Sequence, residues 1–229
     1  MDADIAIFLD ADCKVTENFI SAHCQLHKDH SETACFGGAI QGEGIGIWAR
    51  IDGLMSWFTS LPGSRPHVVK APYHLPTTNM SIKLSLFKTE RLFVETLHTG
   101  EDVDFNVTSR KKGLVFRFNP FPIIHHKDRE TFKKFFVHQY RWGMHFYAAR
   151  FGDQPMGLIS RGLFALSFLC AAPAYILLAT ILNVFPLVRI SPLNFIWFPV
   201  IMLFYAIKSL AVVHGKMVSR KRNVANNQN

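Results

Sequence analysis

Two long apolar runs dominate the second half of the chain. Residues 162–185 carry no charged side chain, and residues 193–213 carry only Lys208. A helix rises about 1.5 Å per residue, so about 20 apolar residues cross a hydrocarbon core of about 30 Å. The pattern therefore predicts two transmembrane helices joined by a short turn. A pair of buried helices in a larger soluble protein is the alternative.

A much shorter apolar run opens the chain. It extends over residues 5–9 and ends abruptly at Asp10 and Asp12. A continuous run of this length predicts a β-strand buried on both faces, and ligands bind at the carboxyl ends of such strands in open α/β sheets. Two carboxylates one residue apart suit a Mg²⁺ or Mn²⁺ ion, which prefers oxygen ligands. An acidic turn that only caps the strand is the alternative.

Two further segments have a clear local pattern. Thr16 is a candidate N-cap for a helix over residues 17–27. Residues 119–126 alternate between side-chain types as a strand does, so His125 and His126 should point to opposite faces of a sheet. Strands therefore alternate with helices along this half of the chain, which predicts an α/β domain.

Composition narrows the class of protein. Hydrophobic residues make up 49% of the chain and charged residues 18%, with 21 Phe. This excludes a disordered tail or a nucleic-acid-binding arm despite the net charge of +8, and we expect no nucleic-acid partner. The four cysteines include no Cys-x-x-Cys pair, which favours reduced thiols in a cytoplasmic setting.

The distribution of basic residues predicts an orientation in the membrane. The turn at residues 186–192 has one Arg, whereas the tail at residues 214–229 has four basic residues and no acid. The positive-inside rule places such a tail in the cytoplasm. The two ends of a transmembrane hairpin lie on the same side of the membrane, so the soluble half should be on the side of the tail. The opening sequence has no signal-peptide pattern, so nothing in it predicts export. We therefore expect a multi-pass protein of the cell membrane whose soluble half and tail are cytoplasmic. The tail's basic residues are Lys216, Arg220, Lys221 and Arg222.

Five segments, in this order, resemble family 2 glycosyltransferases, which are inverting enzymes with a GT-A nucleotide-sugar-binding fold. The segments are IAIFLDADC (5–13), GGAIQGEG (37–44), TTNMSIKLSLF (77–87), GEDVDFNVTSRKKG (100–113) and NPFPIIHHKDRETF (119–132). The ordered set is far more specific than any one motif. The resemblance implies a nucleotide-sugar donor, a lipid-linked or glycan acceptor, and a divalent metal ion.

The resemblance also implies roles for individual residues. Asp102, beside Glu101 at the start of a predicted helix, would be the general base that takes the proton from the acceptor hydroxyl. A carboxylate there is also favoured by the helix dipole alone, so an N-terminal acidic cap is the alternative. His126 would join Asp10 and Asp12 as the metal-binding or diphosphate-facing histidine; a strand-end histidine without a ligand is the alternative.

Two positions in the third segment carry further implied roles. Asn79 lies in the part of the family pattern that lines the cleft between donor and acceptor. Lys83 stands where a basic residue is common, whereas Leu84 stands where many members have a second one. The resemblance implies contacts from Asn79 and Lys83 to the donor or acceptor.

Residues 131–150 form a predicted helix with an aromatic face beside a cationic face, which favours a helix lying on the membrane surface. A surface helix with a solvated basic face is the alternative. Processive members of the family carry Gln-x-x-Arg-Trp here; this chain has Arg141 and Trp142, but His138 at the Gln position. These three residues are implied to bind donor or acceptor. The aromatic face comprises Phe132, Phe136, Tyr140, Gly143 and Tyr147, and the cationic face Lys134, His138, Arg141 and His145.

Members of the family have a nucleotide-binding half before the acidic strand, and we expect this chain to lack it. The sequence therefore predicts a partial GT-A-like, Rossmann-like α/β domain, an interfacial helix and a transmembrane hairpin. The function expected is metal-dependent, inverting glycosyl transfer. Two alternatives are a non-catalytic membrane protein that keeps the domain as an interaction module, and a metal-dependent phosphoryl-transfer enzyme. We expect the partial GT-A-like domain over residues 1–130 and the interfacial helix with its linker over residues 131–157. The two transmembrane helices are expected over residues 158–213 and the basic tail over residues 214–229.

Overall fold

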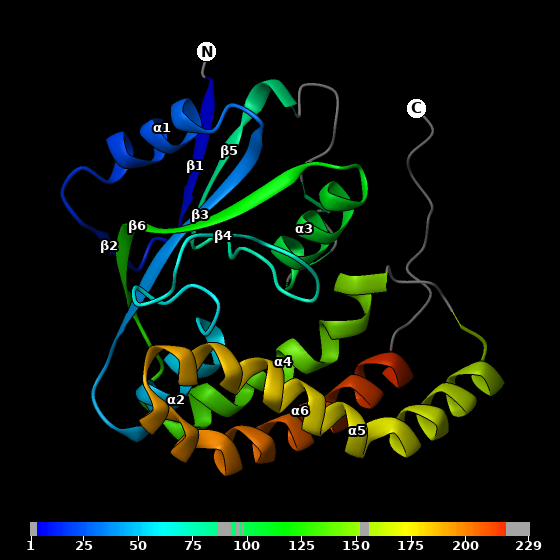
Figure 1. Cartoon of the computed structure of the whole chain (residues 1–229). Helices are drawn as coiled ribbons and strands as arrows, with labels where there is room; N and C mark the ends of the chain where they lie inside the picture. The colour runs from blue at the N-terminus through cyan, green and yellow to red at the C-terminus, as the bar shows by residue number, and fades with distance from the viewer. Residues whose placement is uncertain (1–3, 87–92, 95–96, 98, 152–155, 219–229) are drawn as a thin grey trace.

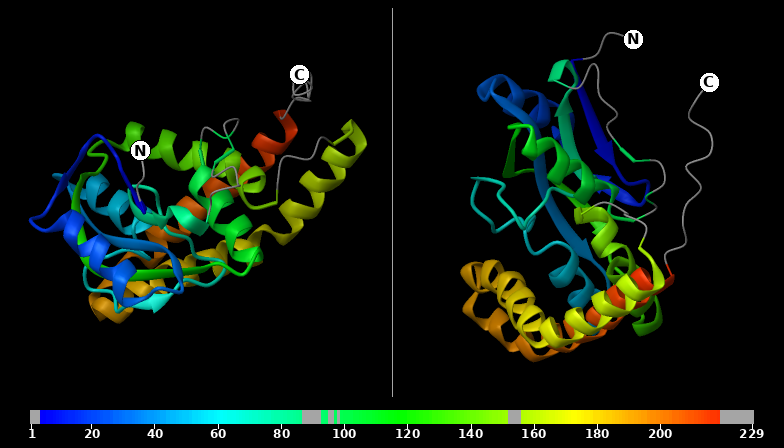
Figure 2. Two further views of the ribbon diagram at one scale, coloured as in Figure 1. Left: turned by 90° about the horizontal axis from the view of Figure 1, so that it is seen from above. Right: turned by 90° about the vertical axis from the view of Figure 1, so that its right-hand side faces the viewer.

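The computed structural model describes residues 4–86, 93–94, 97, 99–151 and 156–218. A mixed β-sheet with flanking helices lies above a layer of three long helices (Figure 1). These are α4 (Phe132–Phe151), α5 (Leu158–Ile190) and α6 (Phe198–Val218). A view from the side shows the same two-layer arrangement (Figure 2). The expected α/β class is confirmed, whereas Arg220, Lys221 and Arg222 of the predicted tail lie outside the described residues.

The sheet has the strand order β1-β5-β3-β6-β2, and β4 also pairs with β6. Among the strands that the structure describes, β3 and β6 run parallel and the other pairs are antiparallel. The predicted strand around residues 119–126 is confirmed as the second half of β6. The strands are β1 (Ile5–Leu9), β2 (Cys13–Val15), β3 (Thr33–Glu43), β4 (His67–Val68), β5 (Asn79–Lys83) and β6 (Val115–Lys127).

The first strand is present as predicted, but its burial is not. Strand β1 pairs with β5 alone among the described strands, and its residues are half-buried except for Leu9, which is exposed. An edge position explains this, because only one side of the strand is covered. Asp10 still follows the strand directly, at its carboxyl end.

The predicted helix after Thr16 begins later than expected. Helix α1 (Phe19–Asp29) has Asn18 at its N-cap position, in the left-handed conformation with φ 61°. The hydroxyl of Thr16 instead donates a hydrogen bond of 3.0 Å to the carbonyl of Ile123 in β6. The N-cap assignment was therefore wrong, because a long-range contact uses the hydroxyl that the local pattern assigned to the helix.

Helix α3 (Glu101–Lys111) covers one end of the sheet core. The core there consists of apolar side chains from β3, β5 and β6, with Phe105 of α3 inserted among them. Gly100 precedes the helix with a φ of 84°, a conformation that a glycine adopts without strain. The predicted helix start at Glu101 and Asp102 is confirmed, and the carboxylate of Asp102 accepts a bond of 2.7 Å from the Val103 amide.

The helix layer shares a hydrophobic core with the domain above it. Met55 of α2 (Ile47–Ser56), Phe135 of α4, Leu187 of α5 and Phe204 of α6 belong to one buried cluster. Burial of such side chains contributes about 1.5–3 kcal/mol each. The half of the α5–α6 hairpin nearest its turn is therefore attached to the domain by side-chain packing rather than by its connection alone.

Helix α6 packs against part of the aromatic face of α4. A side chain at Gly143 would collide with Ala211, and Gly215 lies against the backbone of Met144, so the two helices approach closely. The Tyr140 hydroxyl lies 2.9 Å from Nδ1 of His214. This face is expected from the sequence to lie on the membrane; small residues on both helices let Gly143 pack against α6, whereas Phe132 of the same face is exposed.

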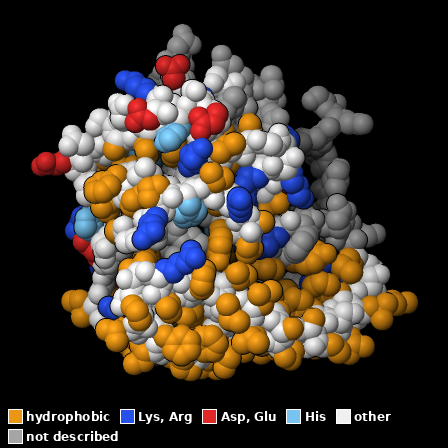
Figure 3. Space-filling model, viewed as in Figure 1, with side chains coloured by type: hydrophobic (Ala, Val, Ile, Leu, Met, Phe, Trp, Pro, Cys, Tyr) orange, Lys and Arg blue, Asp and Glu red, His pale blue; other side chains and the backbone are white. Residues whose placement is uncertain are grey.

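Helices α5 and α6 form the predicted hairpin, joined by a short 3-10 helix (Pro192–Trp197). The two candidate spans, Leu158–Ile190 and Pro192–Val218, are long and apolar enough to cross a membrane, and little of either is buried within the protein. This argues against the alternative of two buried soluble helices. Their exposed apolar side chains form a continuous surface at the bottom of the molecule, with Lys and Arg side chains above it (Figure 3).

Candidate active site

A cavity of about 400 Å³ lies between the sheet domain and the helix layer. The sheet domain contributes Asp10 after β1, His126 near the end of β6, and Asp102 in the first turn of α3. The helix layer contributes side chains from all three of its helices. The cavity therefore joins acidic groups from the sheet to aromatic and basic groups from the helices. The lining residues from the layer include His138, Gln139, Trp142, Phe146, Arg150, Tyr175, Tyr205 and Lys208.

Asp10, Asp12 and His126 form a cluster with metal-ligand spacing. One side-chain donor atom from each lies within 4.8 Å of the others, and Nε2 of His126 is 4.0 Å from Oδ2 of Asp12. Pairing of β2 with β6 produces this arrangement, because Cys13 lies opposite His126 in the ladder and Asp12 directly precedes Cys13. The sequence alone did not predict that pairing.

The orientation of His126 fits a metal ligand. Its Nδ1 atom lies 3.0 Å from Oδ1 of the buried Asp128, which also accepts a hydrogen bond of 2.9 Å from Nε1 of Trp57. A proton on Nδ1 leaves the lone pair of Nε2 directed toward Asp12. Histidine ligands of metal ions usually have such a carboxylate partner. Two carboxylates and one imidazole can hold Mg²⁺ or, with its greater tolerance of nitrogen ligands, Mn²⁺.

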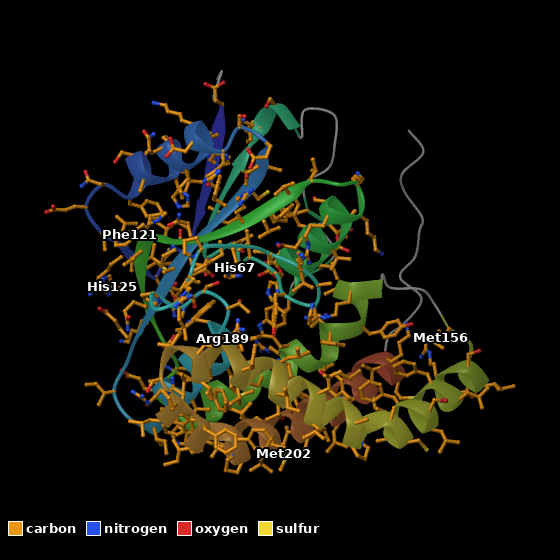
Figure 4. All side chains as sticks on the ribbon, viewed as in Figure 1. His67, Phe121, His125, Met156, Arg189 and Met202 are labelled. Carbon is orange, nitrogen blue, oxygen red and sulfur yellow. The ribbon has the colours of Figure 1, made fainter. Side chains whose placement is uncertain are left out.

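The two neighbouring histidines of β6 face different surroundings, as predicted. His126 is buried, whereas Nδ1 of His125 lies 2.9 Å from Oε1 of Glu43. His125 lies at the outer edge of the sheet in Figure 4. Asp10 is held on the cavity side, because its Oδ2 accepts a bond of 2.9 Å from the Thr78 hydroxyl.

Asp102 has the environment of a general base. Burial and, to a smaller extent, repulsion from Glu101 raise the pKa of Asp102 to about 7, although the Val103 amide and Arg150 lower it in part. A base whose pKa is close to the working pH combines a useful fraction of the charged form with a useful proton affinity. Glu101 also lines the cavity, one residue earlier on α3.

His74 is a cavity residue that the sequence did not reveal. Its Nε2 atom lies 3.7 Å from Oδ2 of Asp102, and its ring is 6.1 Å from that of Trp142. Burial, with repulsion from nearby cations, lowers the pKa of His74 to about 3, so the imidazole is neutral. The residue stands in an irregular segment between β4 and β5, where no periodicity identifies it.

The structure brings together most of the predicted site residues, but three lie elsewhere. Asn79 is fully buried, and its amide nitrogen donates to the carbonyls of Ala39 and Pro122. Lys83 donates a bond of 2.8 Å to the carbonyl of Ser31, on the far side of β5, and Arg141 is exposed on α4. By contrast, His138 and Trp142 line the cavity. Asn79 therefore holds strands together, and its placement gives no support to a role in the cleft.

Comparison with known proteins assigns the family. The profile described as glycosyl transferase family group 2 matches residues 7–210, from β1 into α6. Among curated proteins, none matches the chain. The mixed α/β architecture is consistent with the GT-A fold that the five sequence segments imply. The match covers most of the chain, including every residue of the cavity named above, and the chain therefore belongs to glycosyl transferase family group 2.

Proposed function

We propose that the protein transfers a sugar from a nucleotide-sugar donor, with inversion, to a lipid-linked or glycan acceptor. One observation carries this proposal: Asp102 lines the same cavity as Asp10 and His126 of the metal-ligand cluster. In one shared cavity, a base can act on the attacking hydroxyl while a metal site acts on the leaving diphosphate. The family supports a transferase, and the cavity supports the assignment of roles.

The residues divide the chemistry between them. Asp102 takes the proton from the acceptor hydroxyl as that oxygen attacks the anomeric carbon, and the bond to the diphosphate breaks on the opposite side. Asp10, Asp12 and His126 would hold a divalent ion, which would stabilise the negative charge on the departing nucleoside diphosphate. A single displacement inverts the anomeric centre and needs only one protein carboxylate as base.

Membrane association follows from the exposed surface of the helix layer. Leu163, Leu177 and Leu203 are each about half exposed or more, and apolar side chains form a continuous surface at the bottom of the molecule in Figure 3. A continuous apolar surface rimmed by basic side chains fits a bilayer better than water. In Figure 4, Met202 lies on the lower side of the layer and Arg189 on the upper side, toward the domain.

The contacts of the hairpin favour a layer that lies along the membrane surface over a hairpin that crosses it. Near the turn, the guanidinium of Arg50 in the domain lies 5.7 Å from the ring centre of Trp197, and Ile190 packs against Gly63. A turn that contacts the catalytic domain is on the same side of the bilayer as that domain. We therefore propose in-plane binding on the side of the bilayer that the domain occupies. The crossing hairpin expected from the sequence is the alternative, since both helices are long and apolar enough to cross.

The proposal is tested by turnover of the purified full chain in lipid nanodiscs. The chain is incubated with a panel of nucleotide-sugars and Mn²⁺, and release of nucleoside diphosphate is measured. We expect release with at least one donor, loss of release in the presence of a chelator, and loss in Asp102→Asn. Donor binding without release in any condition supports the interaction-module alternative instead.

A further inference from the structure

Two basic side chains from the helix layer reach the cavity that holds Asp102. Arg150 lies near the end of α4 and Lys208 in the middle of α6, and both line the cavity. The guanidinium of Arg150 lies 4.6 Å from the ring centre of Phe146. The Nζ atom of Lys208 donates a bond of 3.2 Å to Oε1 of Gln139. These contacts position both cations without neutralising them.

Neither cation makes an ion pair with a carboxylate in the part of the chain that the structure describes. Asp102 is the one carboxylate among the groups that raise the pKa of Arg150, and burial raises the pKa of Asp102 to about 7. An uncompensated cation in a partly dehydrated site has a large desolvation penalty. Proteins keep such groups mainly where a ligand supplies the opposite charge. Lys208 is also the one charge in the apolar run at residues 193–213.

The other groups around the two cations add hydrogen-bond donors and aromatic surface. The hydroxyl-bearing side chains of Tyr175 and Tyr205 line the same part of the cavity, and Lys208 lies 5.7 Å from the Tyr205 ring and 5.8 Å from the Trp142 ring. This set is rich in donors and poor in acidic acceptors. A phosphate group, with several acceptor oxygens and negative charge, matches it.

We propose that Arg150 and Lys208 bind a phosphate or diphosphate group carried by the acceptor. The inference rests on the proposed function, because Asp102 is then the base beside the bound acceptor. Asp10 and His126 of the metal-ligand cluster line the cavity from the sheet domain, and the two cations line it from the helix layer. The donor diphosphate and the acceptor phosphate thus have separate anchors, with Asp102 contributed by α3.

The acceptor phosphate can belong to a lipid or to a soluble phosphorylated sugar. The helix layer that carries Arg150 and Lys208 also carries the apolar outer surface, so a lipid phosphate can reach the site from the bilayer. Binding is measured by titrating the full chain in detergent, with chelator and without donor, while following tryptophan fluorescence. The probes are dodecyl phosphate, glucose 1-phosphate and a nucleoside diphosphate.

We expect saturable binding of dodecyl phosphate that is weakened about tenfold or more in Arg150→Gln and in Lys208→Gln, because each loses a charge-assisted hydrogen bond. Arg150→Lys keeps the charge and should bind more tightly than Arg150→Gln, which separates a charge effect from misfolding. Lys133→Gln, an exposed change on the same helix, is the matched control and should bind as the parent does. Stronger binding of glucose 1-phosphate, with the same sensitivity, would assign the site to a soluble acceptor.

Two results overturn the proposal. One is that both Gln variants bind every phosphate probe as Lys133→Gln does. The other is that the two Gln variants lose binding of the nucleoside diphosphate alone, which would assign Arg150 and Lys208 to the donor diphosphate. The titration uses neither metal nor donor, so its outcome is independent of turnover. If the chain binds dodecyl phosphate through Arg150 but releases no nucleoside diphosphate in the turnover assay, the phosphate site stands and the transferase proposal is refuted.

Discussion

The Nε2 atom of His74 lies 3.7 Å from Oδ2 of Asp102, on the wall of the cavity that also holds Asp10 and His126. The distance is longer than a hydrogen bond, so the two groups are neighbours that a bound acceptor can bring together. The two pKa values move in opposite directions, to about 7 for Asp102 and about 3 for His74. At neutral pH the imidazole is therefore an uncharged donor beside a carboxylate that can gain a proton.

Asp102 should be required for turnover. Asp102→Asn keeps the size of the side chain but cannot accept a proton, so the rate should fall by about 10²- to 10⁴-fold while donor binding changes little. In the parent, kcat/KM should rise with pH through about 7, because the active base is the deprotonated form. Glu101→Gln is the matched control and should have a milder effect. Near-parental turnover of a folded Asp102→Asn protein would leave only the helix-cap interpretation.

His74 should set the pH at which Asp102 becomes active. His74→Leu removes a polar neighbour of the Asp102 carboxylate. The loss of that neighbour disfavours the charged form of Asp102, so the midpoint of the pH–rate profile should move upward. His74→Gln retains an amide donor and should move the midpoint less. Parallel profiles for parent and His74→Leu, with only the height changed, would show that His74 has a packing role alone.

The metal-ligand cluster makes a separate prediction about ion binding. Asp10→Asn and Asp12→Asn should each weaken Mn²⁺ binding in calorimetry, because each loses an anionic oxygen ligand. Asp128→Asn should weaken it about 10- to 100-fold without touching the ion, because Asp128 orients His126. Glu43→Gln, on the outer side near His125, should leave the affinity unchanged. Unchanged affinity in both Asp10→Asn and Asp12→Asn would remove the metal role.

The residue pattern alone predicted those parts of this site that have local signals, and the family resemblance added His126, His138 and Trp142. A strand followed by Asp10 and Asp12, and a helix start at Glu101 and Asp102, are visible in adjacent residues. The pairing of β2 with β6, which brings Asp12 to His126, is set by tertiary contacts over more than a hundred residues. His74 has no periodic context at all, so only the folded chain reveals it.

The same dependence on contacts between residues distant in sequence explains where the structure departs from the expectations. Thr16 has the right chemistry for an N-cap, yet its hydroxyl bonds to β6. Tyr140 and Gly143 belong to a helical face that suits a membrane surface, yet both contact α6. In each case a residue with a plausible local role is used by a partner distant in sequence, and pattern analysis has no access to that partner.

Two buried histidines of α1 predict loss of stability in acid. His23 and His27 both contact the hydroxyl of Ser81, and burial lowers the pKa of each to about 4. The unfolded chain binds their protons near pH 6.5 and the folded chain only near 4. Stability should therefore fall as pH is lowered from about 6.5 to 4, by roughly 1.4 kcal/mol per pH unit for each histidine at most.

Thermal unfolding in detergent at a series of pH values measures this dependence. His27→Gln should reduce the slope of Tm against pH between 6.5 and 4, because one proton fewer is taken up on unfolding. Gln25→Ala, on the same helix, removes no titrating group and should preserve the slope. An unchanged slope in His27→Gln would assign the acid sensitivity to other groups.

The last prediction concerns the position of the hairpin in the membrane. If α5 and α6 lie along the bilayer surface, the turn and the catalytic domain are on one side, since Arg50 contacts Trp197 there. Ser191→Cys in the turn and Glu17→Cys in the domain, each in a cysteine-free background, should then react with an impermeant thiol reagent under the same condition, namely after permeabilisation of the cells. A hairpin that crosses the bilayer gives the opposite result: Ser191→Cys would be labelled in intact cells while Glu17→Cys would not. Comparing the two positions isolates the geometry of the hairpin from the question of which side the domain occupies.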